Sequence, residues 1–174
     1  AAQGGCGLAA GVAHPDGAAT LVGFRDEAGG SRRGWVVRLD AAGTLLWQAA
    51  AGEPGQQELG GLTATPQGLL AAGFRAAGGA KVAWWLGIDA LGGVPWQRLG
   101  TGGQEAAAAA SQAGLAVVVA GSTTGGLPQP WWQAVTPGGH VLWQGTLPVQ
   151  GAAALTAVAE ASDGGLVAVG ATTL

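Results

Sequence analysis

The chain has 174 residues, of which 48% are hydrophobic and 10% charged, and its formal net charge is −3 at pH 7. So much apolar material with so few charges excludes an intrinsically disordered chain and is ample for a packed core. All seven basic residues lie within the first 98 residues, together with seven acidic ones, so there is no basic stripe for a nucleic acid or an anionic membrane surface. No apolar run approaches the roughly 18 to 20 residues that span a bilayer.

Tryptophan recurs at a fixed spacing. Three pairs of tryptophans are each separated by twelve residues, and the pairs follow one another at steps of 49 and 47 residues. A period of about fifty residues predicts a propeller or a solenoid, whose units stack because none can bury its apolar face alone. The pairs are Trp35 with Trp47, Trp84 with Trp96, and Trp131 with Trp143.

The first unit predicts four short strands. Two apolar strands are separated by a turn at Gly17, and the second of them ends at Gly23. A polar loop leads to a third strand over 35–40, a turn at Gly43 and a fourth strand that opens at Trp47. Runs of about six apolar residues bounded by Gly, Asp and Pro are typical of strands joined by tight turns.

The same pattern returns in the later units. The aligned glycines are Gly68, Gly73 and Gly92 in the second unit, Gly114, Gly121 and Gly139 in the third, and Gly165 and Gly170 in the fourth. The sequence therefore predicts a single all-β domain over 1–174, a β-propeller of four-stranded blades of about 49 residues. We expect blades at about 7–55, 56–103 and 104–149, with half of a fourth at 150–174.

Such a propeller is incomplete as a closed ring. An open ring leaves an apolar face and an unpaired strand edge in water, which proteins rarely tolerate. We therefore expect the rest of a longer chain, or a protein partner, to complete it.

Two alanine-rich segments favour helix by propensity alone, Glu105 to Ser111 and Ala152 to Ala161. Both are shorter than the roughly 12 to 15 residues that an isolated helix needs. Each also falls where the first strand of a unit belongs. The register of the repeat therefore predicts inner strands built from small side chains.

The segments 35–47 and 84–96 both read Trp-x-x-x-Leu/Ile-Asp-x-x-Gly-x-x-x-Trp. This pattern resembles the blade repeat of bacterial β-propeller proteins, many of them exported. Its second half is also similar to the tryptophan-docking motif of quinoprotein propellers, whose tryptophans lie between adjacent blades. The turn here is one residue shorter, the threonine before the glycine is missing, and the third unit has Thr136 in place of the aspartate. The resemblance implies a fold and carries no functional residue across.

The six periodic tryptophans have two interpretations. Recurrence in every unit favours packing between blades, whereas a functional interpretation would make them a stacking platform for sugars or bases. Trp85 and Trp132 are additional, because they stand where the first unit has Val36. They could add to the core or line an exposed surface.

The densest charge in the chain lies between the second and third strands of the first unit. There Arg25, Asp26 and Glu27 precede Arg32 and Arg33. A solvated loop is one interpretation. The other is a ligand or partner contact through Arg25, Asp26, Arg32 and Arg33, since propellers bind through loops that project from one face.

The sequence contains no motif that supplies chemistry. Cys6 is the only cysteine, and His14 and His140 each lie beside a turn. We predict no catalytic residue, no metal site and no bound cofactor. A glycan hydrolase would need two carboxylates, which would have to come from turn and loop residues such as Asp16, Asp26, Glu27, Glu53 and Glu58.

Two classes of function remain. The first is a non-catalytic propeller scaffold that binds a protein or a small ligand through its loops. The second is the propeller part of an exported enzyme, either a quinoprotein-like oxidoreductase or a glycan hydrolase. The chain starts with Ala-Ala-Gln and has no methionine, which is typical of a processed, exported protein, so we expect an extracytoplasmic location, periplasmic or secreted.

Overall fold

The computed structural model describes residues 4–100, 104–112, 116–124 and 126–173, and these form strands and turns with no helix. The strands are β1 (Cys6–Ala13), β2 (Ala19–Asp26), β3 (Arg32–Leu39), β4 (Leu45–Ala51), β5 (Gln57–Thr65), β6 (Gly68–Ala77), β7 (Ala80–Ile88), β8 (Trp96–Leu99), β9 (Gln104–Gln112), β10 (Ala116–Thr123), β11 (Pro130–Val135), β12 (Val141–Thr146), β13 (Ala152–Glu160) and β14 (Leu166–Thr173). Most are longer than the six residues that the sequence pattern suggests.

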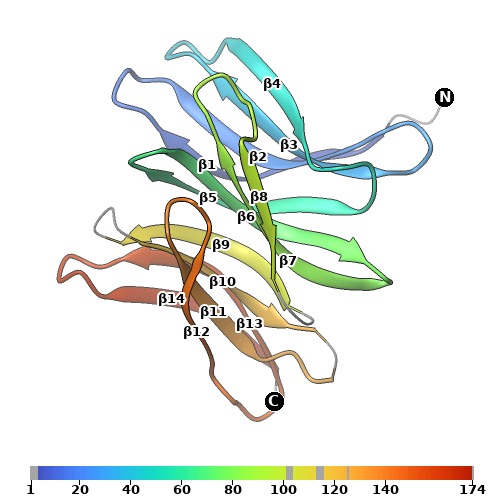
Figure 1. Cartoon of the computed structure of the whole chain (residues 1–174), viewed down its shortest axis with the longest axis vertical. Coiled ribbons are helices and arrows are strands. Elements are labelled where there is room, and N and C mark those ends of the chain that lie inside the picture. Colours follow the sequence, from blue (N-terminus) through green and yellow to red (C-terminus); the bar gives the residue numbers. More distant parts are fainter. Residues whose placement is uncertain (1–3, 101–103, 113–115, 125, 174) are drawn as a thin grey trace.

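The strands form four antiparallel sheets in chain order. Three sheets have four strands each, β1 to β4, β5 to β8 and β9 to β12, and the described part of the fourth consists of β13 and β14. The prediction of four strands per unit is confirmed, as is the prediction that both alanine-rich segments are strands, because they are β9 and β13. In Figure 1 the sheets follow one another along the longest axis, from the first sheet near the top to the third and fourth in the lower half. Their first strands are neighbours, with β5 between β1 and β9, and β9 next to β13.

Every sheet carries a β-bulge in its first strand. The register between first and second strand shifts at the same place each time, so one residue of the first strand is left without a partner. Opposite the bulge lies the second glycine of each unit, and a Cβ there would collide with a backbone carbonyl of the first strand. These glycines are Gly23, Gly73, Gly121 and Gly170. The expectation that they end the second strand was wrong, because each strand continues for at least two residues beyond its glycine.

The core lies between the sheets. Successive residues of a strand point to opposite faces, so Trp84 packs against the first sheet together with Val22, whereas Trp85 packs against the third sheet together with Trp131. We call the face turned toward the next sheet in the chain the forward face, and the opposite one the backward face. Trp84, Trp85 and Trp131 are at most 2% exposed.

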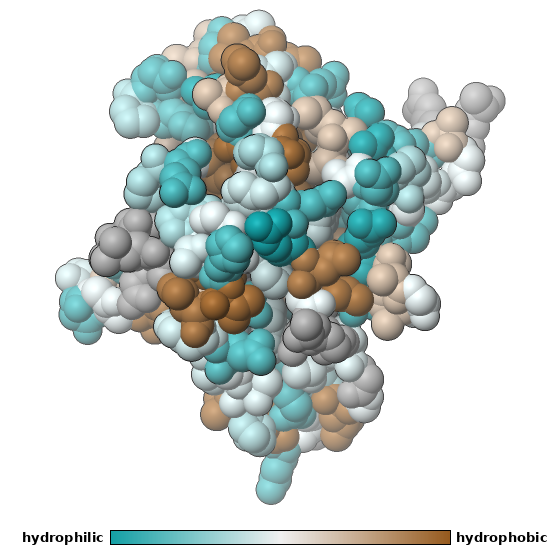
Figure 2. Space-filling model, in the orientation of Figure 1, coloured by the Kyte–Doolittle hydropathy of each residue, from teal (hydrophilic) through white to brown (hydrophobic). Residues whose placement is uncertain are grey.

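The two outer faces of the stack are less covered. Trp35, which occupies the position of Trp84 on the backward face of the first sheet, is only half-buried. On the forward face of the fourth sheet, Val167 and Val169 are 54% and 56% exposed, although Val22, at the position of Val169 in the first sheet, is fully buried. Figure 2 shows apolar patches among hydrophilic groups on the side turned to the viewer.

Candidate functional site

Arg32 is the centre of the predicted charge cluster. Its Nε donates to Asp26 Oδ1 at 2.7 Å, and its guanidinium lies 3.9 Å from the centre of the Phe24 ring. The same guanidinium forms an ion pair with Glu58, the second residue of β5. Since Asp26 and Phe24 belong to the first sheet and Glu58 to the second, Arg32 joins the two sheets.

The same arrangement recurs one repeat later. Lys81 Nζ lies 2.9 Å from Glu105 Oε1 and 4.1 Å from the centre of the Phe74 ring. Lys81 stands three residues before Trp84, as Arg32 stands three residues before Trp35. In both places a cation lies over a phenyl ring of its own sheet and pairs with a glutamate of the next sheet. The repeat of this contact is hard to recognise in the sequence, because the cation is Arg in one unit and Lys in the next.

Arg33 holds the connection between the first and second sheets. Its Nη2 donates to the carbonyl oxygen of Gly52 at 2.6 Å, and Glu27 lies 3.6 Å from its Nη1. Arg25 forms a second ion pair with Glu27, at 3.3 Å. Gln129, at the position of Arg33 in the third unit, binds the corresponding connection, because its Oε1 accepts from the Val149 N–H at 2.7 Å.

The ion pair changes the acidity of both partners. Hydrogen bonding from Arg32, followed by its charge and by the N–H of Gly5, holds the pKa of Asp26 below its ordinary value of 3.8. The two carboxylates, Asp26 and Glu58, raise the pKa of Arg32 further above its already high value. Both groups are therefore charged throughout the neutral range.

The structure brings the four predicted contact residues together, though not in a loop. Arg25 and Asp26 are the last residues of β2, and Arg32 and Arg33 are the first of β3, so only the five residues between them connect the strands. Each of the four side chains has an ion-pair partner within the chain. Whether they also contact a ligand remains a prediction.

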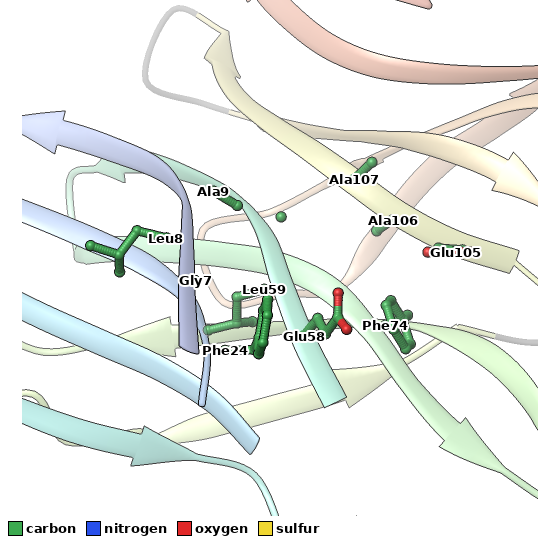
Figure 3. A pocket seen from close by; sticks show the side chains of 11 residues that line it. Gly7, Leu8, Ala9, Phe24, Glu58, Leu59, Phe74, Glu105, Ala106 and Ala107 are labelled. Carbon is green, nitrogen blue, oxygen red and sulfur yellow. The ribbon is translucent and has the colours of Figure 1, made fainter. Parts of the chain in front are cut away.

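A cavity of about 230 Å³ lies beside this cluster, where β1 and β5 begin. Figure 3 shows the Glu58 carboxylate between Phe24 and Phe74, with Glu105 on the neighbouring strand β9. Residues 7–9 of β1, 59–60 of β5 and 106–107 of β9 form the rest of its wall. We call this side of the stack, which carries the connections 27–31 and 78–79, the β2–β3 end. The expectation that Asp26 and Glu58 lie in turns or loops was wrong, because Asp26 ends β2 and Glu58 is the second residue of β5. The proximity of Glu58 to Glu105 could not be predicted from sequence, because the two residues lie in different repeats and meet only through the stacking of first strands.

The fourth-strand tryptophans contact the next sheet. The ring of Trp47 lies over Gly92, where a Cβ would come within 2.8 Å of it, and Trp96 lies over Gly139 in the same way. Both glycines are in the turn between third and fourth strands and have φ of +83° and +82°. Trp85 adds a hydrogen bond from its Nε1 to the Gly139 carbonyl oxygen, at 2.9 Å. The tryptophans of one sheet therefore contact the turn between the third and fourth strands of the next sheet.

The packing interpretation is confirmed for the tryptophans between sheets. Trp84, Trp85 and Trp131 are buried and present no surface for stacking a sugar or a base. Trp143 differs, since it is 45% exposed and lines a cavity of about 320 Å³ together with Trp132. That cavity lies between the third and fourth sheets.

The remaining candidates are dispersed. His14 accepts or donates at Thr20 Oγ1 with a separation of 2.8 Å, and Asp16 lies 3.4 Å from Arg38. His140 is exposed in a turn of the third sheet, and Cys6 is exposed at the start of β1. Within the described ranges, no three His, Cys, Asp or Glu side chains converge on a point that could hold a metal ion.

No protein-family model matches this chain, and no curated protein matches its sequence. In the part of the chain that the structure describes, no helix is long and apolar enough to cross a membrane.

Proposed function

We propose that this chain is a β-propeller segment of three four-stranded blades and the first half of a fourth, and that it serves as a non-catalytic binding scaffold. The observation that carries the proposal is the repetition of one set of contacts between successive sheets. First strands lie side by side, and each fourth-strand tryptophan covers the turn glycine of the next sheet where that turn is present. Blades around a common axis make such contacts.

The use of the charged residues supports a scaffold over an enzyme. The carboxylates of Asp26, Glu58 and Glu105 are held by cations of the chain itself. A general acid or nucleophile needs a carboxylate that faces a substrate with its proton affinity adjusted to the reaction. Glu58 and Glu105 instead join neighbouring sheets, and Asp26 pairs with Arg32 within the first sheet, which are structural roles.

The binding surface that we propose is the β2–β3 end. Its connecting segments project beside the 230 Å³ cavity, whose two phenyl rings and two carboxylates could receive a compact ligand or one side chain of a partner protein. Arg25, with a side chain 38% exposed, is the most accessible cation of the cluster and is placed to contact the partner at its rim.

The test is site-specific photo-crosslinking in an extract of the source cells. A photoreactive amino acid replaces Arg25 in one variant and Ala42, an exposed turn residue at the opposite end of the first sheet, in the control. We expect a defined adduct from position 25 that is absent at position 42 and is lost when Phe24 is changed to Ala. Equal labelling at both positions would contradict the β2–β3 end as the site, and hydrolase or quinone-dependent activity abolished by Glu58→Gln would show that the chain is part of an enzyme.

A further inference from the structure

The cavity at the β2–β3 end has a charge that narrows the class of its ligand. Its walls come from the first, second and third sheets, each of which has all four strands. Its charged lining groups are the carboxylates of Glu58 and Glu105, and no lysine or arginine of the described chain is among the lining residues. An anionic ligand would therefore meet two like charges, whereas a cation would meet two opposite ones.

The ion pairs behind the cavity leave one negative charge in excess. Two cations of the chain pair with three carboxylates, which are Arg32 and Lys81 with Asp26, Glu58 and Glu105. Arg25 and Arg33 both pair with Glu27, and neither of them lines the cavity. A guest with one positive charge therefore balances the group around the cavity, as partly buried charges require.

The two phenyl rings favour the same kind of guest. A phenyl ring attracts a cation through the negative face of its π system, and rings beside carboxylates form the cages that bind alkylammonium groups. Phe24 and Phe74 lie in contact with cations of their own sheets, at 3.9 and 4.1 Å from the ring centres, and both rings line the cavity. The Glu58 carboxylate lies between them (Figure 3).

Neither the ring nor the carboxylate is needed to build a sheet of this repeat. The carboxylate stands two residues before the bulged residue, where the first sheet has Gly7 and the fourth has Ala154. The ring follows the glycine opposite the bulge, where the third sheet has Ser122 and the fourth has Ala171. The combination of both groups around one cavity is therefore a property of this place and is not required by the strand packing.

Size limits the guest to a small group. The cavity measures about 230 Å³, less than the roughly 300 to 1,000 Å³ of pockets that bury a drug-sized molecule. A second cavity, of about 200 Å³, shares Ala9 and Gly60 with it and continues along the first strands between small side chains. A slender alkyl chain with a cationic end fits this shape.

We infer that the cavity binds the alkylammonium group of a ligand, carried either by a lysine side chain of a partner protein or by a free small amine. The ammonium lies between Glu58 and Glu105, beside the two phenyl rings. The alkyl chain passes Ala9 toward the second cavity. This inference rests on the proposed function, because it takes the β2–β3 end as the binding surface, and it adds the charge and the shape of what binds there.

The probe is n-butylammonium, which reproduces the end of a lysine side chain. Its neutral match is n-butanol, which has the same number of non-hydrogen atoms. Each is titrated into the isotope-labelled full chain at constant ionic strength, and the NMR shifts of the Gly7 and Gly60 amides are followed. We expect saturable shifts with a dissociation constant on the order of 1 mM for the amine, as a ligand of this size allows. Binding of butanol should be weaker by about tenfold or more, because it lacks the charge.

Matched variants assign the binding to the cavity. Glu58→Gln and Glu105→Gln should each weaken the amine about fivefold to tenfold, since each removes one charge. Glu53→Gln is the control, because Glu53 is an exposed glutamate outside the cavity, and affinity should stay within about twofold. Ala9→Leu fills the cavity from an exposed position of its wall and leaves every ion pair in place. It should also weaken binding about tenfold, which keeps the test decisive if a glutamine variant fails to fold.

A lysine whose amino and carboxyl ends are both capped as amides identifies the source of the ammonium. Binding as tight as that of butylammonium would assign the site to a lysine of a protein, and binding of butylammonium alone would assign it to a free amine.

Three results would overturn the inference: equal affinity for butanol and the amine, unchanged affinity in Ala9→Leu, or equal effects of the cavity and control glutamine variants. Each can occur while position 25 still forms its cross-link, and the proposed function then stands with an uncharged contact. Loss of that cross-link while the amine still binds would contradict the partner contact and leave the cation site in place.

Discussion

The repeated tryptophans differ in environment because their sheets differ in position. Trp84 is fully buried between the first and second sheets, whereas Trp35, at the same place in the repeat, is covered by no other sheet of the described residues and is half-buried. Both donate an indole hydrogen bond to the glutamine that follows the fourth-strand tryptophan of their own sheet, Gln97 at 3.1 Å and Gln48 at 2.9 Å. The two indoles thus make the same hydrogen bond within their own sheets, and they differ in whether another sheet covers the ring.

This pair permits a matched measurement of interface energy. We expect Trp84→Ala to lower the free energy of unfolding by about 3 to 5 kcal/mol, since it empties a large buried site. Trp35→Ala should cost less than half as much, because the ring covers only its own sheet. Equal losses in denaturant unfolding would show that the covering sheet contributes little.

Asp26 provides a prediction for pH. Because its pKa is lowered in the folded chain, its ion pair with Arg32 stabilises the fold above the ordinary pKa of 3.8, and this contribution is lost as the pH falls through the folded value. The difference in unfolding free energy between wild type and Asp26→Asn should therefore be constant between pH 6 and 8 and shrink below pH 4. A difference that grows on acidification would contradict the assignment.

At the level of elements, the turn between third and fourth strands is the part that one sheet presents to the one before it. Gly43, Gly92 and Gly139 all have φ near +80°, so an added side chain strains each of them alike. Only the last two lie under a tryptophan, since no heavy atom lies within 4 Å of a Cβ built at Gly43.

Substitution of these glycines separates backbone strain from docking. Gly43→Ala should cost about 1 to 2 kcal/mol from its positive φ alone. Gly139→Ala should cost roughly 1 to 3 kcal/mol more, because its methyl group displaces the Trp96 ring. Thermal and urea unfolding would measure both, and equal costs would show that the ring moves aside freely.

Strands and turns were predictable from the sequence where they recur at the same position in each repeat. The four-stranded units, and the strand character of β9 and β13, followed from register even against the helix propensity of alanine. The bulge opposite Gly73 could not be predicted in this way. A glycine inside a strand looks like the end of that strand when the partner strand is not known. The contact of Lys81 with Glu105 was also missed, since ion pairs between repeats depend on a stacking that no local pattern encodes.

On the scale of the whole molecule, the forward face of the fourth sheet is not covered by another sheet of the described residues. Val167 and Val169 are exposed on its forward face, while the corresponding residues of the second sheet, Leu70 and Ala72, are fully buried. The difference lies in the covering sheet, which the second sheet has and which the described residues do not supply for the fourth.

Dye binding should report this face. We expect the double substitution Val167→Thr with Val169→Thr, which keeps β-branching, to reduce the fluorescence of a bound hydrophobic dye roughly by half. Leu46→Thr, at an exposed position of the first sheet, is the control and should have little effect. If the control lowers the signal equally, the dye reports scattered apolar residues.

The repeated ion pair and the tryptophan over a turn glycine also make the units interchangeable. Arg32 and Lys81 carry the same charge, and Glu58 and Glu105 are the same residue, so removal of one unit, from β5 to β8, would bring Arg32 to Glu105 and Trp47 to Gly139 with both contacts intact. The hydrogen bond from Trp85 and the packing of its ring beside Trp131 would be lost, because Val36 stands at that position. Gain or loss of a whole repeat, by duplication or deletion of its coding segment, would therefore preserve the ion pair and the contact between tryptophan and turn glycine. The one substitution that such a deletion calls for is a larger side chain at Val36, to fill the space of the Trp85 ring.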